Sequence, residues 1–164
     1  MKQYKLVDRI YSVLSCTLED IPFHIERVLS YWEETNTDVS TQTEYLIKAV
    51  KAGTAFKVVT SNDTELAVIY CNQLRPQVMQ SNLMWLKSKF VFAILNYHFR
   101  MYEDIRVIQF MPHAKNFIPF EFAIKDSSIR TFHSHNTPLV ADFYSSKSQY
   151  MYEKYFKDIN VEEV

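Results

Sequence analysis

The chain has 164 residues, a formal net charge of −1 and 48% hydrophobic residues, enough for the core of one domain of ordinary size. The balance of 18 basic and 19 acidic side chains argues against a broad electrostatic grip on nucleic acid. Only one glycine is present, Gly53, which excludes the glycine-rich dinucleotide turn, the Walker loop and the glycine-flanked nucleophile elbow.

The first half of the chain shows alternating strand and helix patterns. A strand is predicted over 10–14, followed by an amphipathic helix that carries Trp32, with Thr17 as its N-cap. A second helix is predicted over 41–52, where Thr41 and Glu44 have the spacing of a capping box. Gly53 follows it directly, at the position where a left-handed C-cap is needed.

The second half continues the alternation. Strands are predicted over 55–60 and 65–74, joined by a hairpin at 61–64, and a third strand over 78–85 in strict alternation. A long helix over 87–103 and a buried strand over 105–111 follow. A short helix over 113–125, strands over 129–133 and 139–144, and an aromatic-rich helix over 146–158 complete the order.

This order of elements is similar to that of the GNAT (N-acetyltransferase) superfamily, and the similarity covers most of the chain. The segment Cys16–Pro22 resembles the way many GNAT domains enter their first helix, and Leu86–Leu95 stands where the family has its acetyl-CoA loop. The resemblance implies a single α/β domain over 1–164, with a mixed, mostly antiparallel sheet flanked by helices.

In the family, consecutive loop amides at a helix N-terminus point at the pyrophosphate of the cofactor. The resemblance assigns this cofactor-binding role to Lys87, Ser88, Lys89 and Phe90, with Lys87 as the basic residue. No glycine of the family loop remains, and phenylalanine stands where the family has small residues. Acetyl-CoA is therefore a candidate cofactor, but we expect none to be bound.

The catalytic groups of the family also lack clear counterparts. The family often has a tyrosine after an asparagine beyond the fifth strand, whereas Asn116 is followed by phenylalanines. The strand over 78–85 carries no carboxylate base, which leaves Glu65 and His113 as the nearest substitutes. If the chain is an enzyme, the candidate catalytic residues are thus His113, Glu65 and Asn116.

These departures resemble those of reduced GNAT-like proteins encoded by phages. We therefore predict a non-catalytic GNAT-like protein that acts through protein contacts, as a virion component or host-interaction factor, in the host cytoplasm or packaged in a virion. The alternative is an acyl-CoA-dependent N-acyltransferase with a remodelled, glycine-free loop. No membrane span is expected, because no stretch reaches the roughly 18 apolar residues required. Cys16 and Cys71 are expected to be reduced core residues.

A second alternative is a metal-dependent hydrolase. His133 and His135 would lie on one face of a strand and could share a metal ion, and they resemble the His-x-His pair of JAMM-type zinc proteases. A serine stands downstream where those proteins have a ligand aspartate. The preferred prediction assigns no metal site.

The last predicted helix is dense in aromatic side chains. Tyr150, Met151, Tyr152 and Tyr155 are the residue types that anchor protein interfaces. We expect them to bind a protein partner or a second copy of the chain.

Overall fold

The computed structural model of the chain describes residues 1–34, 36–87, 89–105, 107–110, 139–142 and 160–164. The short helix predicted over 113–125, the strand over 129–133 and the aromatic helix over 146–158 lie outside these residues.

The described strands form a single eight-stranded sheet in the order β7-β6-β5-β4-β3-β2-β1-β8. All neighbouring pairs are antiparallel except β5 and β6, which are parallel. The mixed, mostly antiparallel sheet of the predicted α/β fold is thereby confirmed. The strands are β1 (Lys2–Leu6), β2 (Arg9–Ser15), β3 (Ala55–Thr60), β4 (Glu65–Arg75), β5 (Val78–Leu86), β6 (Val107–Phe110), β7 (Leu139–Asp142) and β8 (Val161–Glu163).

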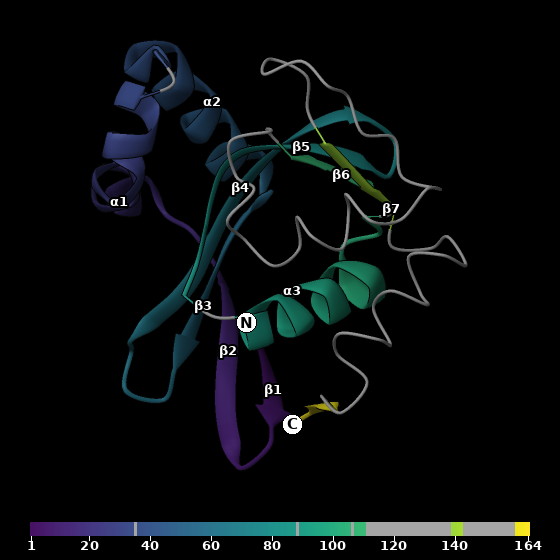
Figure 1. The fold of residues 1–164 in the computed structure, drawn as a ribbon. Helices are drawn as coiled ribbons and strands as arrows, with labels where there is room; N and C mark the ends of the chain where they lie inside the picture. Colours follow the sequence, from purple (N-terminus) through teal and green to yellow (C-terminus); the bar gives the residue numbers. More distant parts are fainter. Residues whose placement is uncertain (35, 88, 106, 111–138, 143–159) are drawn as a thin grey trace.

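Helices cover both faces of the sheet (Figure 1). The short 3-10 helix η1 (Leu18–Asp20) leads into α1 (Ile21–Glu34), and α1 and α2 (Val39–Ala52) lie on one side. The helix α3 (Lys89–Tyr102) lies on the other side. Each face has its own core: Trp32 and Leu46 pack against Val68 and Leu83 on one side, while Ile94 and other α3 side chains pack in the second cluster.

One of the two predicted helix starts is confirmed and the other is corrected. Thr17 is the N-cap of η1, in a capping box in which the carboxylate of Asp20 accepts from the Thr17 N–H at 2.8 Å. The second helix begins a turn early because Asp38, and not Thr41, is its N-cap. The Asp38 carboxylate accepts from the Ser40 N–H at 3.1 Å. The predicted cap at Gly53 is confirmed, with φ of +74°.

Two strands were missed by the sequence prediction. The strand β1 pairs with β2 on one edge and with β8 on the other, so that Leu6 lies opposite Val161. β8 has only three residues and β1 only five, and each alternation is too short to stand out. The remaining described strands and α3 agree with prediction to within two residues at each end.

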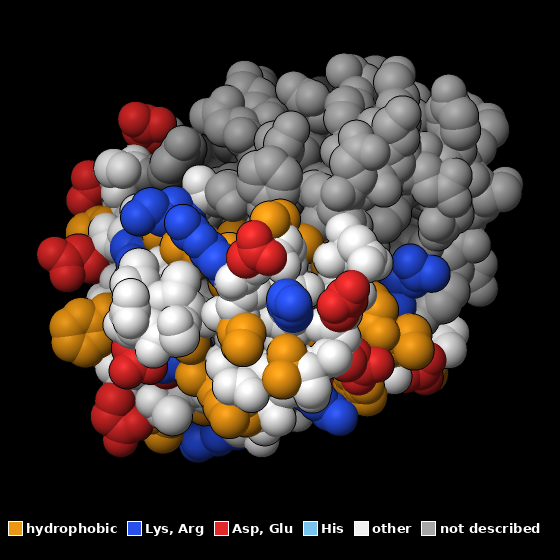
Figure 2. All heavy atoms as spheres, turned by 90° about the horizontal axis from the view of Figure 1, so that it is seen from below, with side chains coloured by type: hydrophobic (Ala, Val, Ile, Leu, Met, Phe, Trp, Pro, Cys, Tyr) orange, Lys and Arg blue, Asp and Glu red, His pale blue; other side chains and the backbone are white. Residues whose placement is uncertain are grey.

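The described surface is mixed in charge. Figure 2 shows acidic and basic side chains interspersed over one face, with hydrophobic side chains between them. Within the described residues, no helix combines the length and apolar character needed to cross a membrane.

Candidate functional site

The site begins with an extra residue in β5. Tyr70 of β4 lies opposite Leu83, but the next residue, Cys71, lies opposite Ser81, so Asn82 has no partner on β4. Such a bulge bends the strand and re-aims its side chains. The strict alternation predicted over 78–85 is wrong here, because Met79 packs on the α3 side and Leu83 on the α1 and α2 side.

A pocket of about 260 Å³ lies at this bulge. The described residues that line it come from α1, α2, the segment between them and β5: Trp32, Thr37, Gln42, Tyr45, Gln80, Ser81 and Asn82. None of these side chains carries a charge at neutral pH. This bulge pocket therefore suits an uncharged polar group.

Two amide atoms at this pocket are buried without a partner among the described residues. They are Oε1 of Gln42, an acceptor, and Nδ2 of Asn82, a donor. Buried polar atoms are nearly always hydrogen-bonded to protein or ordered water, so each of these calls for a partner. A ligand that both donates and accepts, such as an amide, matches the two atoms together.

The pocket adjoins the described pairing of β5 with β6. β5 and β6 pair over Val78, Met79 and Gln80. Beyond Gln80, the part of β5 that leads to α3 has no partner on this edge among the described strands.

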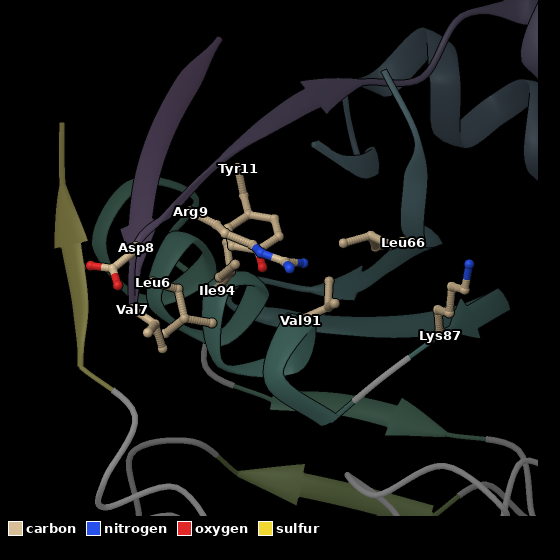
Figure 3. Close-up of a pocket in the computed structure, with 9 residues that line it drawn as sticks. All are labelled: Leu6, Val7, Asp8, Arg9, Tyr11, Leu66, Lys87, Val91 and Ile94. Atoms are coloured by element: carbon tan, nitrogen blue, oxygen red, sulfur yellow. The ribbon is translucent and has the colours of Figure 1, made fainter. Parts of the chain in front are cut away.

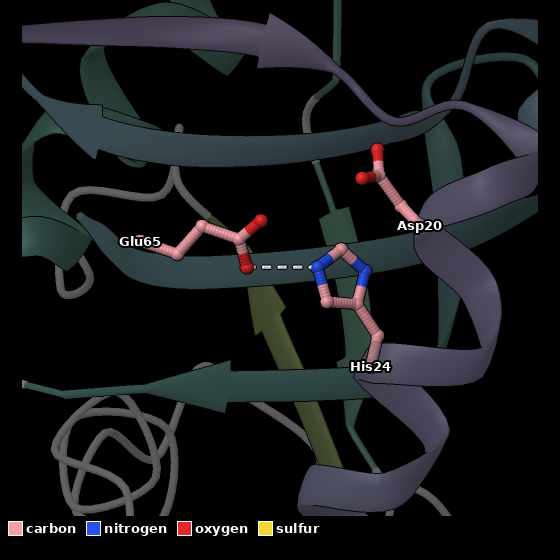
Figure 4. Close-up of side chains that lie close together, drawn as sticks. All are labelled: Asp20, His24 and Glu65. Carbon is pink, nitrogen blue, oxygen red and sulfur yellow. Dashed lines mark hydrogen bonds and ion pairs between the residues drawn. The ribbon is translucent and has the colours of Figure 1, made fainter. Parts of the chain in front are cut away.

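A cluster of charged side chains lies on the same face of the sheet, at the start of β4 (Figure 4). Glu65 accepts from His24 Nε2 at 2.8 Å and from Arg27 at 2.5 Å. Lys57 Nζ lies 3.0 Å from both carboxylate oxygens of Asp20 and 3.8 Å from Glu65. The cluster combines Asp20 of η1 with His24 and Arg27 of α1. Lys57 comes from β3, and Glu65 comes from β4.

The hydrogen bonds fix the state of His24. Because the Glu65 carboxylate can only accept, Nε2 of His24 carries the proton, and Nδ1 accepts from the Tyr70 hydroxyl at 2.6 Å. Burial lowers the pKa of His24, partly offset by Glu65, so the ring is neutral at neutral pH. The pKa of Glu65 is lowered by its bonds with Arg27 and His24, which outweigh burial.

Asp20, His24 and Glu65 have the ligand types of a metal site, and one ligand atom from each lies within 4.8 Å of the others. The two carboxylates, however, already contact the cationic groups of Lys57 and Arg27. A metal ion would have to displace one of these side chains. The arrangement therefore fits an internal ion-pair cluster better than a metal centre.

Only part of the predicted site is brought together. Glu65 is seven residues from Asn72, which pairs with Gln80 beside the pocket, a span of roughly 20 Å along a strand. Glu65 is thus remote from the pocket. Lys87 is exposed at the end of β5, and Lys89 and Phe90 are the first residues of α3. Ser88, His113, Asn116, His133 and His135 lie outside the described residues.

The sequence analysis missed Gln42, Asn82 and His24. Asp20 and His24, at i and i+4 on one helical face, were a signal for a shared environment. The bulge that buries Asn82 had no such signal. Cys16 and Cys71 are buried free thiols, and burial raises the pKa of each to about 12.

No family model and no curated protein matches this chain. Among solved structures, it is similar to a GNAT-family acetyltransferase from Listeria monocytogenes, with a TM-score of 0.54 and 5% identity, covering 84% of this chain and 96% of that one. A spermidine N-acetyltransferase chimera from Vibrio cholerae and hSSAT has a TM-score of 0.47 and 11% identity, over 79% of this chain and 91% of that one. The likeness to the Listeria protein shows that the fold is GNAT-like.

Proposed function

We propose that this chain is a non-catalytic GNAT-fold protein that acts by binding. The observation that supports this is the uncharged lining of the bulge pocket. Glu65, the predicted substitute base within the described residues, is engaged with Arg27 and His24 and lies roughly 20 Å along the sheet from the pocket.

The chemistry explains why this lining matters. Transfer of an acyl group to an amine requires a proton to leave the nitrogen, and a general base has to lie within about 3 Å of that proton or one water away. No carboxylate or imidazole belongs to the described lining of the pocket. Gln42 and Asn82 can orient an amide but cannot remove a proton at neutral pH.

The direct test is release of free CoA thiol from acetyl-CoA in the presence of a panel of primary amines and polyamines. We expect no release above that of acetyl-CoA alone. Amine-dependent release that Asn82→Ala abolishes and Lys48→Ala leaves unchanged would overturn the proposal. Lys48 is the control because it is exposed on α2.

The second candidate function is an acyl-CoA-dependent N-acyltransferase, and the likeness of the fold to the acetyltransferase from Listeria monocytogenes favours it. The phosphates of an acyl-CoA would then lie near Lys87 and the first turn of α3. Calorimetric titration with acetyl-CoA tests this. Micromolar binding that Lys87→Ala weakens would support it, and no binding at millimolar ligand would exclude it.

The setting in a phage and the action through protein contacts are part of the same proposal and derive from the sequence. Their testable core is the aromatic set Tyr150, Met151, Tyr152 and Tyr155. If these residues bind a second copy, sedimentation velocity of the wild type will show association that rises with concentration, and the Tyr152→Ala, Tyr155→Ala double variant will lose it.

A further inference from the structure

A second hollow, of about 730 Å³, lies on the opposite face of the sheet, between the β1–β2 hairpin and α3 (Figure 3). This volume is within the range of about 300–1,000 Å³ that small-molecule sites occupy. The hollow is separate from the bulge pocket, which faces α1 and α2. A ligand could therefore occupy it whether or not the bulge pocket has the proposed binding function.

The floor of this hollow is aliphatic. Leu6, Val91 and Ile94 are each at most 3% exposed and belong to the core on the α3 side, and Leu66 packs against that core. Val91 and Leu66 both line the hollow (Figure 3). The floor is thus an accessible edge of the hydrophobic core. Binding of an alkyl chain to it is favourable because it removes apolar surface from contact with water.

Polar groups converge at one end of this floor. Arg9 and Tyr11 lie two residues apart on β2, so their side chains are on one face of the sheet, and both line the hollow (Figure 3). Neither side chain has an ion pair or hydrogen bond with another described residue. Asp8, the acidic residue of the lining, turns its carboxylate away from Arg9. The guanidinium and the phenol together match a carboxylate, which accepts from both.

A second basic side chain, that of Lys87, lies at the other end of the hollow. Lys87 lines the hollow beyond Leu66 and Val91 and forms no ion pair within the described part of the chain. Among the described lining residues, the basic ones thus lie at both ends of an aliphatic floor, and the one acid, Asp8, faces outward.

We propose that this hollow binds an aliphatic carboxylate, whose head group is held by Arg9 and Tyr11 and whose chain lies on Leu66, Val91 and Ile94. The site selects an acid over an alcohol of equal length, because only a carboxylate satisfies the guanidinium. It selects a chain over acetate, because the floor needs an alkyl group to cover it.

The test is calorimetric titration of the full chain with octanoate, with octanol and acetate as comparison ligands. We expect octanoate to bind at submillimolar concentration and both comparison ligands to bind at least about tenfold more weakly. Arg9→Met, which keeps most of the aliphatic stem, should weaken octanoate about tenfold, and Tyr11→Phe should weaken it by a smaller factor. The matched control Arg75→Met, at the exposed end of β4, should bind as the wild type does.

Methyl NMR of the wild-type protein provides a test that needs no variant. Octanoate should shift the signals of Leu66, Val91 and Ile94, and saturating acetyl-CoA should leave this binding unchanged. The proposal is overturned by any of four results: no octanoate binding at millimolar concentration, equal binding of octanol, shifts confined to other methyl groups, or loss of octanoate binding on addition of acetyl-CoA.

Discussion

Five described residues other than glycine adopt positive φ: Val7, Asn36, Asp63, Gln77 and Asp104. Three of them are asparagine or aspartate, which tolerate the left-handed region best after glycine. Val7 is different, since a β-branched side chain at φ of +57° is strained. Among the described residues, the left-handed position at Val7 is therefore the one held by a β-branched side chain, which resists it.

Replacing Val7 by glycine should relieve this strain. Val7 is 80% exposed in the two-residue turn between β1 and β2, so little packing is lost. We expect Val7→Gly to raise the free energy of unfolding by about 1 kcal/mol. Thermal unfolding measures it, with Asp63→Gly as the control that should change less. A destabilised Val7→Gly would show that the side chain makes contacts that outweigh its backbone strain.

Two buried histidines share one arrangement. His24 lies between Tyr70 and Glu65. In the same way, Nδ1 of His98 is hydrogen-bonded to the Tyr4 hydroxyl at 2.7 Å, and Nε2 of His98 lies 3.1 Å from the carboxylate of Glu103. Burial, followed by the positive charges of Lys2 and the N-terminus, lowers the pKa of His98 to about 4. Both rings are therefore neutral in the fold at pH 7 and are protonated more readily in the unfolded chain.

This arrangement predicts loss of stability in mild acid. A histidine whose pKa is lower in the fold than in the unfolded chain is protonated first in the unfolded chain. The fold therefore keeps its full stability at a pH above the unfolded pKa of 6.5, and loses stability as the pH falls towards the folded pKa. For His98 the loss should reach roughly 2 kcal/mol by pH 5, partly offset by Glu103, whose pKa burial raises.

Urea unfolding at pH 7 and pH 5 measures this loss. His98→Gln should lower stability at pH 7 and make the pH dependence shallower. A wild-type stability that is equal at the two pH values would contradict the assignment.

At the scale of elements, the start of α2 distinguishes two interpretations of the same segment. The sequence favoured a capping box of Thr41 and Glu44, whereas the structure has Asp38 accepting from the Ser40 N–H and the Thr41 hydroxyl. We expect Asp38→Ala to lower the melting temperature by a few degrees, because the first helical amides lose their acceptor. Glu44→Ala should have little effect. A larger drop in melting temperature for Glu44→Ala than for Asp38→Ala would instead support the capping box of Thr41 and Glu44.

Elements with a long apolar pattern could be predicted from the sequence. Helix α3 has apolar residues at helical spacing, and β3 to β5 are apolar-rich runs bounded by turn residues. β8 is a short edge strand and β1 is its short neighbour, and their pairing depends on each other and on β2. Their formation is a tertiary event, which local pattern does not encode.

The candidate site was less predictable for a related reason. Alternation assigned Asn82 to a face as if β5 were regular, but the bulge arises from how β5 pairs with β4. Glu65 was singled out as a base, and only its neighbours show that it is held by Arg27 and His24. Side-chain type and spacing thus identified residues that matter, but their partners decide what they do.

At the scale of the whole molecule, β8 covers one edge of β1. Tyr97 of α3 also donates to Glu163 of β8 at 2.9 Å, which holds the strand in place. An uncovered edge is a template for pairing with another chain. Removing residues 160–164 should therefore cause self-association at high concentration, measured by sedimentation velocity against the full chain. Glu163→Gln, which keeps the strand, is the control. Identical sedimentation of the truncated and full chains would contradict this role of β8.

The pairing of β1 with β8 also sets an order in time. β1 is made before all the other described strands, and its partner β8 is made only after all of them. At about 5–20 residues per second, the edge of β1 stays open for on the order of ten seconds during synthesis. Nascent chains on neighbouring ribosomes of one messenger RNA would have this edge of β1 unpaired at the same time and close to one another. The lysines at positions 2 and 5 of β1 would then repel the matching edge of a neighbouring nascent chain.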